Sequence, residues 1–99
     1  MTYMPAKEVK FHLKIMTREG KLYEGDVSSI TSYNDKGKFD VLAHHANFIS
    51  LVRNGVEVRE SETREAKDFK FDNALIRVKD DNVGVYVGLE GMRNLPKVA

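Results

Sequence analysis

The side chains of this 99-residue chain that could do chemistry are three histidines and many carboxylates. His44 and His45 are adjacent, so in an extended segment they point to opposite sides and cannot bind one metal ion together. The third, His12, is distant in sequence. The aspartates fall at expected turns, including a tight polar turn predicted at Asp80-Asp81-Asn82, or at outward-facing strand positions, where water solvates them. We therefore predict no metal site and no acid–base pair.

Other kinds of reactive site are also missing from the sequence. No segment has the pattern of a nucleophile elbow, a phosphate-binding loop or a dinucleotide fingerprint. Cysteine is absent, which excludes disulfides, thiol catalysis and thiolate zinc sites and fits a reducing compartment. We predict a non-enzymatic protein with no catalytic, cofactor-binding or metal-binding residues.

A basic stripe near the first expected hairpin indicates an alternative function. A free-standing β-sandwich or barrel that binds a small ligand or single-stranded nucleic acid would have such a stripe beside stacking aromatics. The net charge of +1 gives no general attraction to nucleic acid, and most of these aromatics fall at positions expected to be buried. We keep the binding module as the alternative and expect no nucleic-acid partner. The stripe would contain Lys7, Lys10, Lys14 and Lys21, with Tyr3, Phe11 and Tyr23 as the aromatics.

Short strands separated by turns must position all of these side chains. Apolar and polar residues alternate from Val9 to Met16 and from Val83 to Glu90, which is the period of a strand with one buried face. Turn residues recur at intervals of ~8–12 residues, and no segment has a helical period. We predict an all-β fold, an antiparallel two-sheet β-sandwich of about eight to ten short strands.

Three local features refine this expectation. Val27 and Ile30 lie on opposite parities, which predicts a bulge near Ser28–Ser29 or a strand that crosses from one sheet to the other. The dipeptide Asn54-Gly55 predicts a tight hairpin. Glycines at 84 and 88 share one face of the last strand and leave room for a backbone or a large side chain.

Length and composition predict one folded domain. The 99 residues suffice for a single core that buries roughly two-thirds of the unfolded surface. We expect one domain over residues 1–99, with its core at 8–91 and frayed tails at 1–7 and 92–99. Because neither a signal peptide nor an apolar run of ~20 residues occurs, the cytoplasm is the default and membrane association would require another protein.

Three segments follow, in order, the pattern of a known family. Leu13 to Val27 contain an alternating strand, a short turn and an aromatic-Glu-Gly element. Asp35 to Ile49 follow a corner in which an acidic, glycine-containing strand leads to Leu-Pro-Gly-His-Ala-Pro. Leu75 to Val87 look like a closing hairpin with alternating valines. The matching residues include Thr17, Glu19, Gly20, Tyr23, Glu24 and Gly25, and then Gly37, Phe39, Val41, Leu42, His45, Ala46, Phe48 and Ile49.

Together these segments resemble the N-terminal β-sandwich domain of the epsilon subunit of F-type ATP synthases, the counterpart of the mitochondrial delta subunit. The resemblance implies a non-catalytic rotor subunit that contacts the gamma subunit and the c-ring and couples ring rotation to ATP synthesis. It also implies a peripheral location at the cytoplasmic face of the inner membrane, within the complex. We expect no C-terminal helical hairpin, the family's brake on hydrolysis, within 99 residues; a short subunit and a piece of a longer one both remain open.

The resemblance also implies where the partner contact lies, because the His-Ala corner faces the ring in that family. Lys36 and Lys38 stand where acidic residues are usual, so the local charge is reversed and the contact becomes repulsive unless the partner has changed too. Asp40, Ala43, His44 and Asn47 replace Gly, Pro, Gly and Pro, which predicts a different local backbone. The expected ring-side contact consists of Lys38, Phe39, His44, His45 and Asn47.

Overall fold

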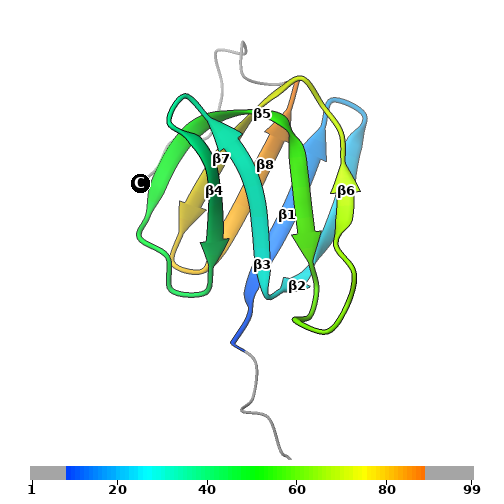
Figure 1. Cartoon of the computed structure of the whole chain (residues 1–99). Coiled ribbons are helices and arrows are strands. Elements are labelled where there is room, and N and C mark those ends of the chain that lie inside the picture. Colours follow the sequence, from blue (N-terminus) through cyan, green and yellow to red (C-terminus); the bar gives the residue numbers. More distant parts are fainter. Residues whose placement is uncertain (1–8, 89–99) are drawn as a thin grey trace, which may run out of the picture.

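The computed structural model describes residues 9–88, which form eight strands (Figure 1). The tails expected at 1–7 and 92–99 lie outside the described residues. Within the described range no helix is present that could cross a membrane. The strands are β1 (Phe11–Thr17), β2 (Gly20–Val27), β3 (Ser29–Asn34), β4 (Gly37–Leu42), β5 (Phe48–Arg59), β6 (Lys67–Phe69), β7 (Asn73–Lys79) and β8 (Asn82–Val87).

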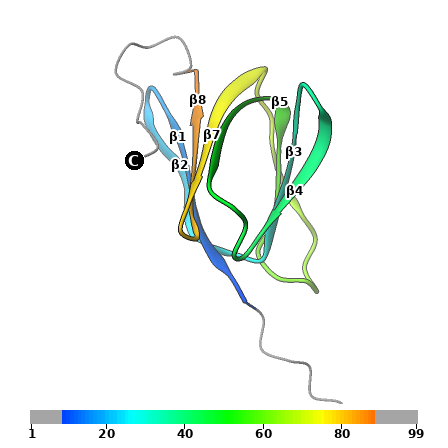
Figure 2. The same ribbon diagram turned by 90° about the vertical axis from the view of Figure 1, so that its left-hand side faces the viewer.

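The strands form a sandwich, as the alternating pattern predicts. Hydrogen bonds link them in the order β2-β1-β8-β7-β5-β3-β4, with β6 beside β5. This path folds over itself, so that β2, β1, β8 and β7 lie in one layer and β3 and β4 in the other (Figure 2). One pair departs from the expected antiparallel arrangement, because β1 runs parallel to β8. No turn joins these two strands, and only strands joined by a tight hairpin are forced to be antiparallel.

Alternation along the strands places the apolar side chains between the layers. Val9, which the pattern assigns to the buried face, is instead 57% exposed because it precedes β1. Ser32 is a buried polar residue, and its hydroxyl donates to the Gly55 carbonyl at 2.8 Å. The core contains Phe11, Leu13, Ile15, Val27, Ile30, Val41, Val52, Val56, Val58, Ala74, Ile76, Val78, Val83 and Val85.

The chain crosses between layers at Ser28, which confirms the predicted crossover. β2 ends at Val27 and β3 begins at Ser29, and the two strands belong to different layers. The backbone N–H of Ser28 and its hydroxyl both donate to the Arg59 carbonyl, at 2.9 and 3.0 Å. The crossing residue is therefore attached to the end of β5.

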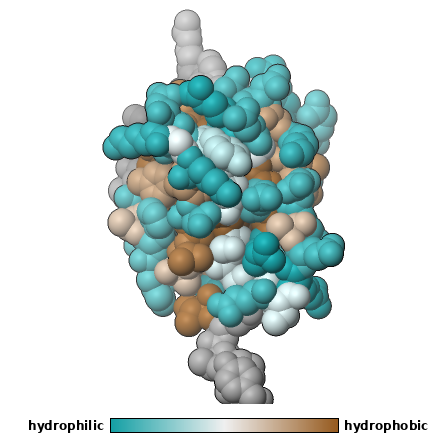
Figure 3. Space-filling model, viewed as in Figure 1, coloured by the Kyte–Doolittle hydropathy of each residue, from teal (hydrophilic) through white to brown (hydrophobic). Residues whose placement is uncertain are grey.

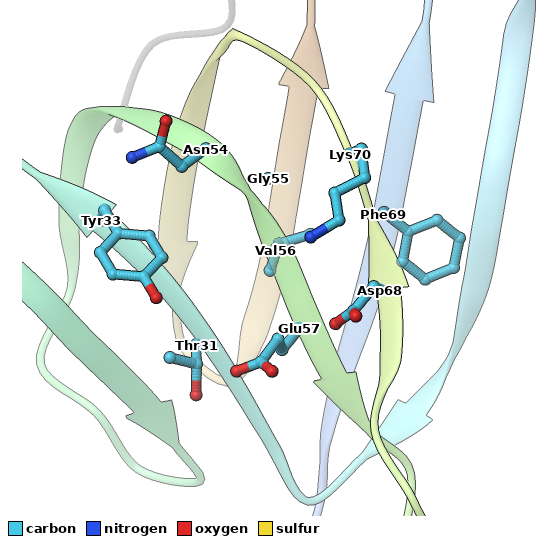
Figure 4. A pocket seen from close by; sticks show the side chains of 9 residues that line it. All are labelled: Thr31, Tyr33, Asn54, Gly55, Val56, Glu57, Asp68, Phe69 and Lys70. Carbon is cyan, nitrogen blue, oxygen red and sulfur yellow. The ribbon is translucent and has the colours of Figure 1, made fainter.

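The predicted hairpin at Asn54-Gly55 is wrong, because β5 continues through both residues. They do adopt the positive φ angles that such a pair favours, 66° and 82°. The angles bend the strand instead of reversing it (Figure 4). Before the bend β5 pairs with β7 and after it β5 pairs with β6, while β3 pairs with β5 on both sides of the bend. The strand bends and does not form a hairpin because its two halves pair with different strands. The Asn54-Gly55 dipeptide alone does not encode that pairing.

Candidate functional site

The connection from β4 to β5 forms the corner on which the expected partner contact lies. His44 has a φ of 65°, a left-handed conformation that glycine favours and in which histidine is tolerated. The backbone N–H of His45 donates to the Leu42 carbonyl at 3.2 Å and closes the turn. A compact kink therefore leads from β4 into β5.

Side chains of the turn between β7 and β8 hold this corner. The backbone N–H of His44 donates to Asp81 Oδ1 at 2.6 Å, and His44 Nδ1 lies 3.0 Å from Asp81 Oδ2. Asn47 Oδ1 accepts from the Asp80 backbone N–H at 2.9 Å, and Asn47 Nδ2 donates to Asp80 Oδ1 at 3.3 Å. These four residues, called the corner latch below, fix the corner of one layer to a turn of the other.

The turn in the latch is a two-residue hairpin, as its sequence predicts. Asp80 and Asp81 both have positive φ angles, 49° and 62°, between the paired residues Lys79 and Asn82. Aspartate is less suited than glycine to this conformation, and the bonds to the corner compensate for part of the strain. The expectation that these aspartates are simply solvated is wrong. Their partners lie 33 and 37 residues away in sequence, so no local pattern could have indicated them.

Three aromatic rings lie side by side next to the latch. The Phe48 ring packs edge-on against Phe39, with centroids 5.9 Å apart, and contacts the His45 ring at 5.0 Å. His45 Nδ1 lies 2.8 Å from the Ala46 carbonyl oxygen. Phe39 and Phe48 are both half-buried and pack against the core, so they anchor the exposed His45 ring. Sequence reasoning treated Phe48 as an apolar residue of the motif and did not include it in the contact.

The structure brings four of the five expected contact residues to one region. His44, His45 and Asn47 lie on the corner, and Phe39 reaches it through Phe48. Lys38 is paired with Tyr33 beside the β3–β4 turn, at the other end of β4. Lys38 directly precedes Phe39, but neighbouring residues of a strand point to opposite faces, so the exposed Lys38 and the half-buried Phe39 face opposite ways. Four residues, or ~13 Å, separate Lys38 from the end of β4 at Leu42. Lys38 is therefore a separate charged position.

Several observations on the described residues bear on catalysis and on nucleic-acid binding. No group of three His, Asp or Glu side chains among them is placed to hold a metal ion. The cavity beside the β5 bend has a volume of about 90 Å³ and is lined by polar and charged side chains together with Tyr33, Val56 and Phe69 (Figure 4). Phe11 is buried, and Tyr23 packs on Phe69 and donates to Glu60 at 2.7 Å, so neither ring is free to stack on bases. Mostly hydrophilic side chains cover the β3–β4 face (Figure 3).

A charge cluster on the β1–β2 hairpin joins His12 to two carboxylates. His12 Nε2 lies 2.7 Å from Glu24 and Nδ1 lies 3.1 Å from Asp26. The hydrogen bond to Glu24, and then that to Asp26, raises the pKa of His12. The hydrogen bond from Lys21, and then that from His12, lowers the pKa of Glu24 to about 2.

This cluster predicts a pH dependence of stability. The contribution of His12 is complete below its ordinary pKa of 6.5 and is lost as pH rises through the raised value. The contribution of Glu24 is complete above 4.5 and is lost as pH falls towards 2. We expect the urea concentration at the midpoint of unfolding to decrease as pH is raised from about 6 to about 9. The decrease should be smaller in His12→Gln. His45→Gln is the control, and an unchanged slope in His12→Gln would refute the assignment.

One known protein family matches almost all of the described chain. Residues 10–88, nearly the whole described range, match the family described as the ATP synthase delta/epsilon chain, β-sandwich domain. The match covers both the corner and the turn of the latch.

Individual relatives agree with this match. The ATP synthase epsilon chain of Sulfurimonas denitrificans is 32% identical over 78 residues, which are 79% of this chain and 60% of that one. The epsilon chain of Campylobacter concisus is 43% identical over 47 residues, which are 48% of this chain and 36% of that one. The chain thus matches between about a third and three-fifths of the length of these relatives.

Solved structures agree on the fold. A chain of the Euglena gracilis mitochondrial ATP synthase superposes with a TM-score of 0.70 at 20% identity, covering 87% of this chain and 53% of its own. A chain from the central stalk and c-ring structure of the Tetrahymena thermophila enzyme gives 0.64 at 15% identity, covering 95% and 83%. At these identities the likeness concerns the sandwich architecture.

Proposed function

Since this chain belongs to the family of the ATP synthase delta/epsilon chain β-sandwich domain, as its sequence pattern indicated, we propose that it is an epsilon-type rotor component of an F-type ATP synthase. It performs no chemistry itself and couples rotation of the c-ring to ATP synthesis by binding the gamma subunit and the ring. Its place is at the cytoplasmic face of the inner membrane, which it reaches through the complex.

The corner latch is the observation that carries this proposal. A component that transmits torque must present its contact surface stiffly, because a loose loop would deform under load. Four contacts between 2.6 and 3.3 Å join the β4–β5 corner to the β7–β8 turn and so to the opposite layer. The contact surface is therefore supported by both layers.

The ring-side contact has two parts. His45 and Phe39, supported by Phe48, offer an aromatic surface next to the latched His44 and Asn47. Aromatic side chains held in place lose little conformational freedom on binding and are frequent at the centre of interfaces. Lys38, the residue before Phe39, points to the opposite face of β4 and is a separate charged position.

Assembly with purified partners tests the proposal. The chain is mixed at micromolar concentration with its cognate gamma subunit, with its cognate c-ring in detergent, and with both together, before gel filtration. We expect it to elute with the gamma subunit, and with the ring once gamma is present. Separate elution in every mixture would contradict the proposed function.

The reversed charge at Lys38 gives a further prediction. A partner that accommodates lysine here must present acidic or neutral groups, so Lys38→Glu should weaken binding to the cognate gamma–ring complex by about three- to tenfold. Lys70→Glu, an exposed change beside β6, serves as the matched control. Affinities are compared at low and high salt, because the effect of an exposed charge declines with ionic strength. Tighter binding by Lys38→Glu would show that the partner surface is basic.

A further inference from the structure

The outward face of the β1–β8–β7 layer carries two cations on either side of a glycine. Gly84 on β8 lies directly beside Lys14 on β1 and beside Arg77 on β7. Inward and outward positions alternate, and the neighbours of these three residues along each strand are buried, so all three face outward. Gly84 has no side chain to separate the two cations.

Neither cation forms an ion pair within 4 Å among residues 9–88, although the Glu24 carboxylate across from Lys14 interacts with it electrostatically. Arg77 Nε is buried and has no hydrogen-bond partner, which is costly for a charged donor. Glu24 lies opposite Lys14, but its two oxygens already accept from Lys21 at 2.6 Å and contact His12 at 2.7 Å. Two cations without a hydrogen-bonded counter-ion and one unsatisfied donor therefore remain, next to the Glu24 carboxylate.

A cavity of about 180 Å³ lies at the same place. The Tyr86 ring folds back over Gly84, as the glycine at this position predicts, and a Cβ on Gly84 would lie 2.6 Å from the Tyr86 hydroxyl. That hydroxyl adds a neutral donor beside the cations. The lining residues are His12, Lys14, Glu24, Arg77, Asn82, Val83, Gly84 and Tyr86.

We propose that the cavity over Gly84 binds a small oxyanion, a phosphate or carboxylate group, between Lys14 and Arg77. The planar guanidinium can bind two oxygens at once, while the ammonium acts as a point charge. The Tyr86 hydroxyl completes the donor set. An oxyanion here would also provide the acceptor that the buried Arg77 Nε lacks. This site is independent of the rotor proposal, because it requires no partner subunit.

Titration of the ¹⁵N-labelled chain followed by NMR tests the site. Inorganic phosphate and acetate are added in separate arms at constant ionic strength, with sodium chloride as the ionic-strength reference. We expect saturable shifts of the amides of Lys14, Arg77 and Gly84 that chloride does not reproduce. Saturation by phosphate alone identifies a phosphate site, and saturation by acetate as well identifies a general carboxylate and phosphate site.

Matched variants locate the binding. Arg77→Gln and Lys14→Gln should each weaken phosphate binding at least tenfold, whereas Lys36→Gln, an exposed lysine elsewhere, should not change it. Lys14 is exposed, so Lys14→Gln keeps the test valid if Arg77→Gln does not fold. Shifts that never saturate, or equal affinity in Lys14→Gln and the unchanged chain, would overturn the proposal. The result does not depend on whether the chain binds a gamma subunit.

Discussion

Gly55→Ala is expected to destabilise the fold by about 3 kcal/mol, from the strain of a left-handed alanine together with overpacking. Gly55 has a φ of 82°, and a Cβ there would lie 2.5 Å from the Phe69 carbonyl oxygen. This oxygen belongs to the backbone of β6, which cannot move aside as the end of a flexible side chain can. The carbonyl of Gly55 also accepts the Ser32 hydroxyl, so a shift of the bend disturbs a buried hydrogen bond.

Gly88→Ala is the matched control for this substitution. Gly88 has a similar φ of 72°, but a Cβ there would meet no atom within 4 Å. Gly88→Ala should therefore lower the free energy of unfolding by only about 1 kcal/mol, which is the strain of a left-handed alanine. Urea denaturation of both variants measures the difference. Equal destabilisation would mean that close packing of β6 against the bend contributes nothing.

Asp81→Ala is expected to cost about 2 kcal/mol, because it removes both contacts to His44 and places alanine at a positive φ. Asp81→Gly separates the two effects, since glycine accepts the backbone angle and still loses the contacts. It should cost about 1 kcal/mol. Thermal or urea unfolding of the pair gives both values.

Hydrogen exchange at one amide reports directly on the latch. The backbone N–H of His44 donates to Asp81 Oδ1, so its exchange should accelerate in Asp81→Gly more than that of core amides. The proposed function adds a consequence, because a loosened corner should also bind the cognate gamma–ring complex more weakly. Unchanged exchange at His44 would show that the corner is rigid without the latch.

Much of the fold could be predicted from local patterns. Alternation identified the first and last strands, and the pair Asp80 and Asp81 predicted a tight turn that the structure contains. The parity change between Val27 and Ile30 predicted the crossing at Ser28. The hairpin predicted at Asn54-Gly55 is wrong, although both residues have the positive φ angles that such a turn needs. The two halves of β5 on either side pair with different strands, so the chain bends there and does not reverse.

The candidate site was predictable only in part. His45 matches the family's motif, and His44 and Asn47 stand on the same corner although they replace its Gly and Pro. Phe39 reaches the corner through Phe48. Lys38 is the direct neighbour of Phe39, but it points to the opposite face of β4 because side chains alternate along a strand. Sequence adjacency therefore does not place their side chains on one surface.

The sequence by itself determined the strand content, most turns and the family of this protein, because those features depend on side-chain alternation and on short motifs. Only the tertiary structure decided what supports the corner and what surrounds Gly84. The latch joins His44 and Asn47 to aspartates on the opposite layer, and the cationic pair joins strands from both ends of the chain. Such contacts depend on how the layers stack and in which register the strands pair, and neither is encoded in any local segment.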